Sequence, residues 1–402
     1  MNKIAVLLGA ILSLVPNIQY LDDLRYRLEP ALEYSVCRSL LCSDRQLLDS
    51  ADRLAHGNKR DKAAAVANLQ EALRRSVADP DRWVALGDAF FEAGRVQEAQ
   101  YCFTRAVDLG PQNPPSFWRT AQFYARIQQP VRSQEYLGKM LALLPEYKEL
   151  VFDTYISSGS DVIETFQHGI PPKSHLAQDY FRYLLAHNAA LADIRKAWDW
   201  LQRNSLNDDR LAGDYVDWLS SRHEYGLAAE TWNRSVTAYD RTYLNPNLVF
   251  NGDFESPPFP SGLDWRFAET PGVTIKRDST VAMSGSSSLK IEFDGKENIN
   301  FNSIAHDVVV TPGRYHFKAW IRTSELTTDQ GIGFRLVDSA GQVNLETKRL
   351  TGTHDWTSLD LDFTLSGAAR LLRIAAIRQP SWKFDNRIAG KVWIDNVSLV
   401  RL

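Results

Sequence analysis

The sequence is poor in cysteine and in net charge, and both shortages exclude a class of protein. Its 402 residues include three Cys and three Met, and the formal net charge is −3. The spacing of Cys37, Cys42 and Cys102 matches no zinc or haem signature. A disulfide between Cys37 and Cys42 requires a turn between them, and both the bonded and the free forms stay open. Cys102 is expected in a helical core. A charge so close to zero lacks the basic footprint of general nucleic-acid binding, so we expect no nucleic-acid partner.

The sequence also lacks the short motifs of common catalytic sites. It contains no phosphate-binding loop, no dinucleotide fingerprint, no His-Glu-x-x-His and no nucleophile elbow. Its eight His are scattered and show no spacing typical of metal ligands. Carboxylates are numerous, but the separation that defines a glycosidase pair cannot be read from a sequence. We therefore expect a protein that is not an enzyme.

Long apolar runs are scarce, and the exception is at the N-terminus. Lys3 is followed by an apolar run over residues 4–15. A charge before a short apolar segment is typical of a secretory signal, and the run is short for a membrane span of about 20 residues. An uncleaved signal anchor, a cleaved signal peptide and a buried helix all remain open for residues 1–21, with the anchor preferred. The positive-inside rule then places the rest of the chain outside the cytoplasm.

Residues 22–243 are predicted to form a helical repeat domain. One repeat follows the pattern W-x2-L-G-x2-[YF]-x8-A-x3-F-x2-A-x4-P, at Trp83, Leu86, Gly87, Phe90, Ala99, Phe103, Ala106 and Pro111. A weaker copy follows about 34 residues later, at Phe117, Ala121, Tyr124, Ser133, Leu137, Met140 and Pro145, and a half-copy precedes at Ala65, Leu69 and Ala72. Two more helical pairs are expected around residues 176–204 and 211–237, with a break at 157–174.

This pattern resembles tetratricopeptide repeats, which stack helical hairpins into an α-solenoid with a long groove. The resemblance implies that protein partners dock in that groove. The alternative is a spacer that only holds the next domain away from the membrane.

Residues 244–402 are predicted to form an antiparallel β-sandwich of about eight strands. Short segments alternate between apolar and polar residues, and turn residues separate them. The clearest example is Tyr315, Phe317, Ala319 and Ile321, which alternate with His316, Lys318, Trp320 and Arg322.

Two motifs of this half make it similar to a known family. Asn251-Gly252-Asp253-Phe254-Glu255 opens the domain, and Trp393-Ile394-Asp395-Asn396-Val397-Ser398-Leu399 closes it. Together they resemble the jelly-roll carbohydrate-binding modules of the galactose-binding-like superfamily. Repeats followed by this sandwich resemble bacterial proteins linked to exopolysaccharide, which implies a polysaccharide partner and the periplasmic side of the inner membrane.

The same resemblance implies a structural calcium ion between the first and last strands. Carried over by position, Glu255 and Asp395 supply carboxylates and Asp253 a weaker third, and such oxygens suit calcium. The alternative is that Asp253 and Asp395 only make turn hydrogen bonds.

Alternation along one strand predicts a binding face. If Tyr315, Phe317 and Ile321 point into the core, then Lys318, Trp320 and Arg322 share the opposite face. A flat aromatic ring between charged donors suits a sugar ring or a partner protein. Arg335 on the next candidate strand and Trp382 in a loop are added to this face, and Trp265 is a candidate for its rim. The alternative is that Trp320 packs beneath a loop or against the helical domain.

Two functions follow from these features. The first is a non-catalytic, membrane-anchored periplasmic adaptor for exopolysaccharide assembly or export, whose repeats dock proteins and whose sandwich binds glycan. The second is an accessory subunit of an integral-membrane complex, respiratory, photosynthetic or secretory, that uses both domains as protein-contact surfaces.

Overall fold

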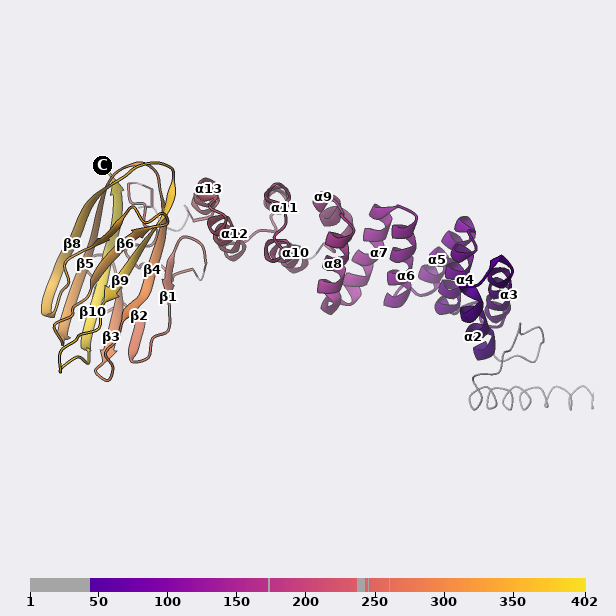
Figure 1. Cartoon of the computed structure of the whole chain (residues 1–402), viewed down its shortest axis with the longest axis horizontal. Helices are drawn as coiled ribbons and strands as arrows, with labels where there is room; N and C mark the ends of the chain where they lie inside the picture. The colour runs from indigo at the N-terminus through magenta and orange to yellow at the C-terminus, as the bar shows by residue number, and fades with distance from the viewer. Residues whose placement is uncertain (1–43, 173, 237–242, 245, 260) are drawn as a thin grey trace, which may run out of the picture. The chain divides into compact units, whose positions relative to one another are not determined.

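Figure 1 shows the computed structural model of the chain, which describes residues 44–172, 174–236, 243–244, 246–259 and 261–402. The expectations for residues 1–21, Cys37 and Cys42 lie outside these ranges. The chain divides into two compact units, one ending at Asn204 and one running from Ser205 to Leu402. Among the helices within the described ranges, none has both the length and the apolar character needed to cross a membrane.

The first unit consists of helices that follow one another as antiparallel pairs (Figure 1). These are α2 (Asp44–Ala55), α3 (Lys59–Arg75), α4 (Pro80–Glu92), α5 (Val96–Leu109), α6 (Pro114–Arg126), α7 (Pro130–Leu143), η1 (Pro145–Tyr147), α8 (Lys148–Ser157), α9 (Val162–Glu164), η2 (Thr165–Gly169), α10 (Ser174–Ala186) and α11 (Leu191–Arg203). The expected break at 157–174 contains the short helices α9 and η2.

Local signals explain where these helices begin. Asn58 accepts hydrogen bonds from two backbone N–H groups of α3, and Asp61 completes a capping box. Asp79 caps α4, which starts with Pro80. Gly94 turns the chain between α4 and α5 with φ +77°, a conformation in which a side chain is strained.

The repeat signature forms the core between helices of the first unit. A Cβ on Gly87 would lie 3.1 Å from the ring of Phe103, so a larger residue would require that ring to shift by a few tenths of an ångström. Phe103 stacks on Phe123 of α6 with ring centroids 4.7 Å apart. Cys102 is buried beside them, as predicted.

The second unit begins with α12 (Asp209–Ser221) and α13 (Tyr225–Val236) and continues into the sandwich. Its strands are β1 (Trp265–Phe267), β2 (Val273–Asp278), β3 (Ser288–Asp294), β4 (Phe301–Val310), β5 (Gly313–Leu326), β6 (Gly333–Asp338), β7 (Asn344–Glu346), β8 (Gly352–Leu365), β9 (Arg370–Arg378) and β10 (Ala389–Arg401). About eight strands were expected; the described residues form ten because β1 and β7 are too short to show alternation.

The strands form two five-stranded antiparallel sheets, in the orders β1-β4-β9-β6-β7 and β2-β3-β10-β5-β8. The core lies between the two sheets, and Phe317 of β5 meets Phe334 of β6 edge to face across it, 5.3 Å apart. The antiparallel sandwich predicted from the sequence is therefore present.

Helices α12 and α13 pack onto the sandwich within the second unit. The indole of Trp232, 1% exposed, meets the ring of Phe250 edge to face at 5.4 Å. Gly262 adopts φ +80° and leaves room for this indole, since a Cβ there would lie 2.3 Å from it. Its N–H donates to Asp217 of α12, which also pairs with Arg266 of β1. Composition predicted a boundary at residue 244, where helices give way to strands, whereas the compact division follows Asn204.

Candidate functional site

Strand β5 alternates as its sequence predicts. Phe317 and Ile321 are fully buried in the core, whereas Lys318, Trp320 and Arg322 are half-buried on the opposite side. That side is the outer face of the sheet β2-β3-β10-β5-β8, which we call the outer face. The structure thus brings the three predicted residues together on one surface.

Strand β10 adds a second tryptophan to the outer face. In the antiparallel register, Trp393 is the partner of Arg322 and Asp395 is the partner of Trp320, and cross-strand partners share a face. The guanidinium of Arg322 lies 6.0 Å from the ring centroid of Trp393, and the ammonium of Lys318 lies 4.8 Å from that of Trp320. Both distances allow cation–π attraction.

The sequence did not predict that Trp393 belongs to this surface. Alternation within β10 does not show which residues of β5 lie opposite those of β10. The indole N–H of Trp393 donates to Asp278 of β2 at 2.9 Å. Burial alone would raise the pKa of Asp278, but hydrogen bonds from Thr280 and Trp393 outweigh it and lower that pKa to about 2. Asp278 is therefore ionised and fixes the orientation of the Trp393 ring.

The segment between β2 and β3 covers Asp395, beside Trp320. The carboxylate of Asp395 is 0% exposed and accepts the N–H groups of Met283 at 2.7 Å and Ser284 at 3.2 Å, and that of Asn396 at 2.7 Å. Burial raises the pKa of Asp395 to about 6, against the effect of these donors. This segment therefore forms a raised border next to Trp320.

Glu255 anchors the same segment from the opening motif. Its Oε1 accepts the N–H groups of Ser286 at 2.7 Å and Ser287 at 2.9 Å, and its Oε2 accepts the Ser286 hydroxyl at 2.6 Å. The hydroxyl of Ser286, followed by these backbone donors, lowers the pKa of Glu255. The opening segment also lies beside β10, since Val397 N–H donates to Gly252 O at 2.8 Å.

Glu255 and Asp395 thus hold residues 283–287 by hydrogen bonds, and we call this arrangement the hydrogen-bonded clamp. The contacts fit this clamp better than a metal site. N–H and hydroxyl donors occupy the carboxylates of Glu255 and Asp395, whereas a calcium ion needs their lone pairs. Asp253 accepts the N–H of Glu255 at 3.4 Å. Within the part of the chain that the structure describes, no three His, Cys, Asp or Glu side chains form a group that could hold a metal. Binding of calcium stays a prediction.

The structure does not place Arg335 and Trp382 on the outer face. Arg335 belongs to β6, which pairs with β9 and β7 in the other sheet, and its guanidinium bonds Glu346 at 2.8 Å. Trp382 lies in the loop before β10 and is 100% exposed. Trp265, a predicted rim residue, is 1% exposed and belongs to the core, because its side chain points inward from the edge strand β1 and packs against Phe254 at 5.0 Å.

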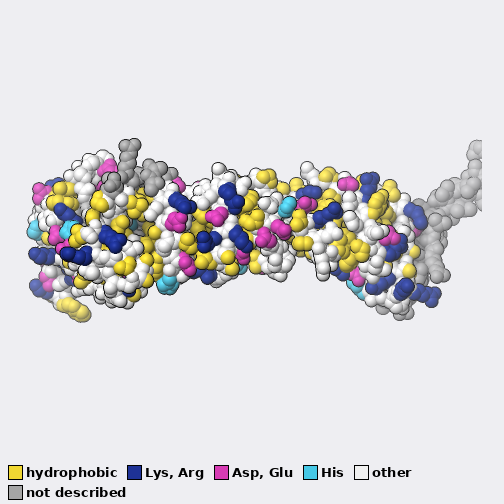
Figure 2. All heavy atoms as spheres, turned by 90° about the horizontal axis from the view of Figure 1, so that it is seen from above, with side chains coloured by type: hydrophobic (Ala, Val, Ile, Leu, Met, Phe, Trp, Pro, Cys, Tyr) yellow, Lys and Arg dark blue, Asp and Glu magenta, His cyan; other side chains and the backbone are white. Residues whose placement is uncertain are grey.

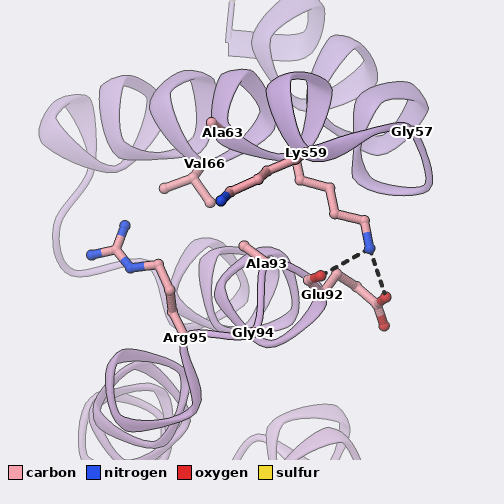
Figure 3. A pocket seen from close by; sticks show the side chains of 9 residues that line it. Gly57, Lys59, Ala63, Val66, Glu92, Ala93, Gly94 and Arg95 are labelled. Atoms are coloured by element: carbon pink, nitrogen blue, oxygen red, sulfur yellow. Dashed lines mark hydrogen bonds and ion pairs between the residues drawn. The ribbon is translucent and has the colours of Figure 1, made fainter.

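The helical unit contains hollows that could take a partner. One of about 470 Å³ is lined by side chains from α2, α3, α4 and α6, with Arg126 hydrogen-bonded to Glu92 at 2.8 Å across it. Figure 3 shows another, of about 530 Å³, between α3 and the turn from α4 to α5. Lys59 and Arg95 line it, and Lys62 donates to the backbone oxygen of Glu92 at 2.9 Å.

One family model matches part of the chain. Residues 246–381 match the family described as carbohydrate binding domain. None of the curated proteins matches the sequence closely enough to count as a relative.

Several solved structures are also similar to parts of the chain. The carbohydrate-binding module TmCBM61 in complex with β-1,4-galactotriose covers 39% of this chain and 99% of its own, at 16% identity and a TM-score of 0.28. The CBM22-1 xylan-binding domain of Paenibacillus barcinonensis Xyn10C covers 37% and 91%, at 14% identity and a TM-score of 0.26. The Yersinia enterocolitica type III secretion chaperone SycD, in complex with a peptide of the translocator YopD, covers 30% and 92%, at 19% identity and a TM-score of 0.25.

Proposed function

We propose that this chain is a non-catalytic adaptor whose outer face binds a glycan and whose helical unit docks a protein. One observation carries the glycan half: Trp320 lies half-buried between Lys318 and Arg322 on an open sheet face. The match of residues 246–381 to carbohydrate binding domains supports glycan binding by this part of the chain.

The chemistry of the outer face suits a sugar. An indole offers an apolar plane on which the C–H face of a sugar ring can stack, and it loses little conformational entropy because it has two rotatable bonds. Lys318 and Arg322 carry N–H donors for sugar hydroxyls on both sides of that plane. The border formed by residues 283–287 limits the direction in which a chain can leave Trp320.

The helical unit supplies the protein-docking half of the proposal. On the face seen in Figure 2, hydrophobic, basic and acidic side chains are mixed over its surface. The hollow between α2, α3, α4 and α6 is lined by helices that belong to successive pairs, as a groove for an extended or helical peptide requires.

A place in exopolysaccharide assembly or export extends this proposal. It rests on the resemblance of the two-part arrangement, and on the exported, anchored N-terminus that residues 1–21 predict. Such an adaptor would keep a polysaccharide next to the proteins that make or move it.

Trp320→Ala in the full chain tests the glycan half. We expect a loss of about 2 kcal/mol, or about 30-fold in affinity, in affinity electrophoresis through gels that contain a polysaccharide. The melting temperature should change little, because the ring is on the outer face. The matched variant Trp382→Ala should keep its affinity. Unchanged migration of Trp320→Ala, or a stability loss of several kcal/mol typical of a buried aromatic, would remove Trp320 from the proposed site.

A further inference from the structure

Two aromatic side chains extend into solvent from the loop between β9 and β10. Trp382 is 100% exposed and Phe384 is 106% exposed, and we call residues 382–384 the tip. A residue this exposed has almost no contact with the rest of its chain. At about 150–250 Å² for each ring, the pair offers about 300–500 Å² of apolar surface, which is the size of the patches that often serve a function on monomeric proteins.

A buried arginine fixes the base of this loop. Arg378, the last residue of β9, is 0% exposed. Its guanidinium donates five hydrogen bonds to three loops, and the acceptors are the side-chain oxygens of Asn298 and Thr328 and the backbone oxygens of Ile299, Gln330 and Asn386. None of these five acceptors is a carboxylate, and burial of a cation without one is costly. The chain thus bears a cost in stability to hold residues 295–300, 327–332 and 379–388 together.

Ser381 extends this rigid base to the residue before Trp382. Its backbone N–H donates to Asn298 Oδ1 at 2.9 Å, and its hydroxyl donates to Asp329 at 2.5 Å. The same hydroxyl accepts the N–H of Lys383 at 3.1 Å. Because both neighbours of Trp382 are fixed, the tip needs little further ordering when its rings enter another environment.

The charges around the tip cancel. Apart from the buried Arg378, the three loops carry three exposed cations and three exposed carboxylates, namely Lys296, Lys383, Arg387, Glu297, Asp329 and Asp385. The ammonium of Lys383 lies 3.5 Å from the carboxylate of Asp329. What distinguishes the tip from the surface around it is therefore its two rings.

The area of the tip is too small for a stable protein interface. Such an interface buries about 800 Å² on each partner, well above the area of two rings. The isoleucines of the same loops, Ile299, Ile332 and Ile388, are at most 6% exposed and add nothing to it. A sugar would need free polar groups beside the ring, whereas those of Ser381 and Asp329 bond each other.

The interface of a lipid bilayer fits the tip, because it requires neither a large area nor a matching shape. Tryptophan is enriched at the level of lipid headgroups, where its ring is in an apolar environment and its N–H is hydrated. Lys383, between the rings, can keep its stem beside them and its ammonium among the headgroups.

We propose that Trp382 and Phe384 insert into the headgroup region of a lipid bilayer and hold this end of the sandwich against a membrane. Zwitterionic lipid suffices, since the charges of the three loops cancel. The contact is reversible, because a small apolar anchor alone binds a membrane only marginally. It does not depend on the glycan-binding function proposed above.

Nanodiscs of phosphatidylcholine test the proposal with the full-length protein. The chain is labelled with 5-fluorotryptophan, and Trp382→Phe assigns the fluorine signal of Trp382. Nanodiscs with and without a nitroxide on the lipid headgroup are compared, so that slower tumbling affects both alike. We expect the nitroxide to broaden the Trp382 signal beyond detection. Trp320 lies about 20 Å along β5 from the loop after Leu326, so its signal should broaden far less.

The labelling separates the tip from an anchored N-terminus. The sequence has no Trp before Trp83, so residues 1–43 contribute no fluorine signal. Added phosphatidylglycerol should change the affinity by less than about twofold, because loops without net charge gain little from an anionic surface.

Single variants locate the contact. Phe384→Ala should lower the affinity for nanodiscs, measured from the broadening of the Trp382 signal, about tenfold, because most of one apolar side chain is lost from the contact. Its melting temperature should not change, since the ring is fully exposed. Tyr101→Ala removes a ring of the helical unit that is 63% exposed; it is the matched control and should bind as the wild type does.

Four results would overturn the proposal. The first is a Trp382 signal that is equally sharp with and without the nitroxide. The second is broadening that requires phosphatidylglycerol, which would show that cations make the contact. The third is a Phe384→Ala variant that binds as the wild type does. The fourth is a Trp382 signal that shifts with a polysaccharide and not with nanodiscs, which would assign the tip to the glycan.

Discussion

Glu255 is the residue at which a metal site and the hydrogen-bonded clamp predict opposite effects of a chelator on stability. Its carboxylate accepts two backbone N–H groups and one hydroxyl from residues 286–287. Glu255→Gln removes the charge and converts one acceptor atom into a donor, which faces another donor. Hydrogen bonds to a charged group contribute about 1.5–3 kcal/mol, and partial exposure of Glu255 reduces that value. We expect a loss of about 1–2 kcal/mol in the free energy of unfolding.

Scanning calorimetry of the full chain measures this loss. For a unit of this size, 1 kcal/mol shifts the melting temperature by about 2–4 °C, so the transition of the second unit should fall by a few degrees. Because the pKa of Glu255 is lowered in the folded state, the stability that Glu255 contributes is present above pH 4.5 and is lost as pH falls through its folded pKa.

A chelator distinguishes the two accounts. With a hydrogen-bonded clamp, EDTA leaves the melting temperature of the wild type unchanged, and Ser286→Ala, which removes one donor, costs about 1 kcal/mol. With a calcium ion bound only to the folded state, EDTA lowers the melting temperature by mass action. A drop with EDTA that Glu255→Gln abolishes would refute the clamp.

Two further predictions concern the second unit. Burial lowers the pKa of His306 from 6.5 to about 4. Between these pH values the unfolded chain binds one more proton than the folded chain, so the free energy of unfolding falls as pH falls, by about 1.4 kcal/mol per pH unit. His306→Gln should remove this slope when urea unfolding is measured across that pH range, and an unchanged slope would show that the pKa of His306 is not lowered. A fragment of residues 205–402 should be more stable than one of residues 244–402 by about 3 kcal/mol or more. The shorter fragment lacks Trp232, whose ring packs against Phe250 and Phe259. Equal melting temperatures of the two fragments would show that Trp232 does not stabilise the sandwich.

The periodic parts of the fold could be predicted from the sequence. Spacing between Gly87, Ala99 and Phe103 predicts a helical hairpin because those residues lie where two helices meet. Alternation along β5 places Trp320 on the outside for the same reason: period two follows directly from the pleat.

The features of the site that depend on pairing between distant segments of the chain could not be predicted from the sequence. Arg335 was assigned to the face of Trp320, yet β6 lies in the other sheet, because strand order in a sandwich does not follow chain order. Trp393 lies beside Arg322 only through the register of β10 with β5. The attachment of α12 and α13 to the sandwich depends on Trp232 and Gly262, and neither residue stands out in its local sequence.

Fluorine NMR of the full chain with 5-fluorotryptophan tests the glycan-binding face most directly. The sequence has 11 Trp, and single Trp-to-Phe variants assign the signals of Trp320, Trp393 and the core residue Trp265. On titration with a polysaccharide that retards the protein in affinity electrophoresis, the account predicts that the Trp320 and Trp393 signals shift together and saturate at one affinity, while the Trp265 signal stays in place. Saturable shifts confined to Trp382, or to tryptophans of the helical unit, would contradict it.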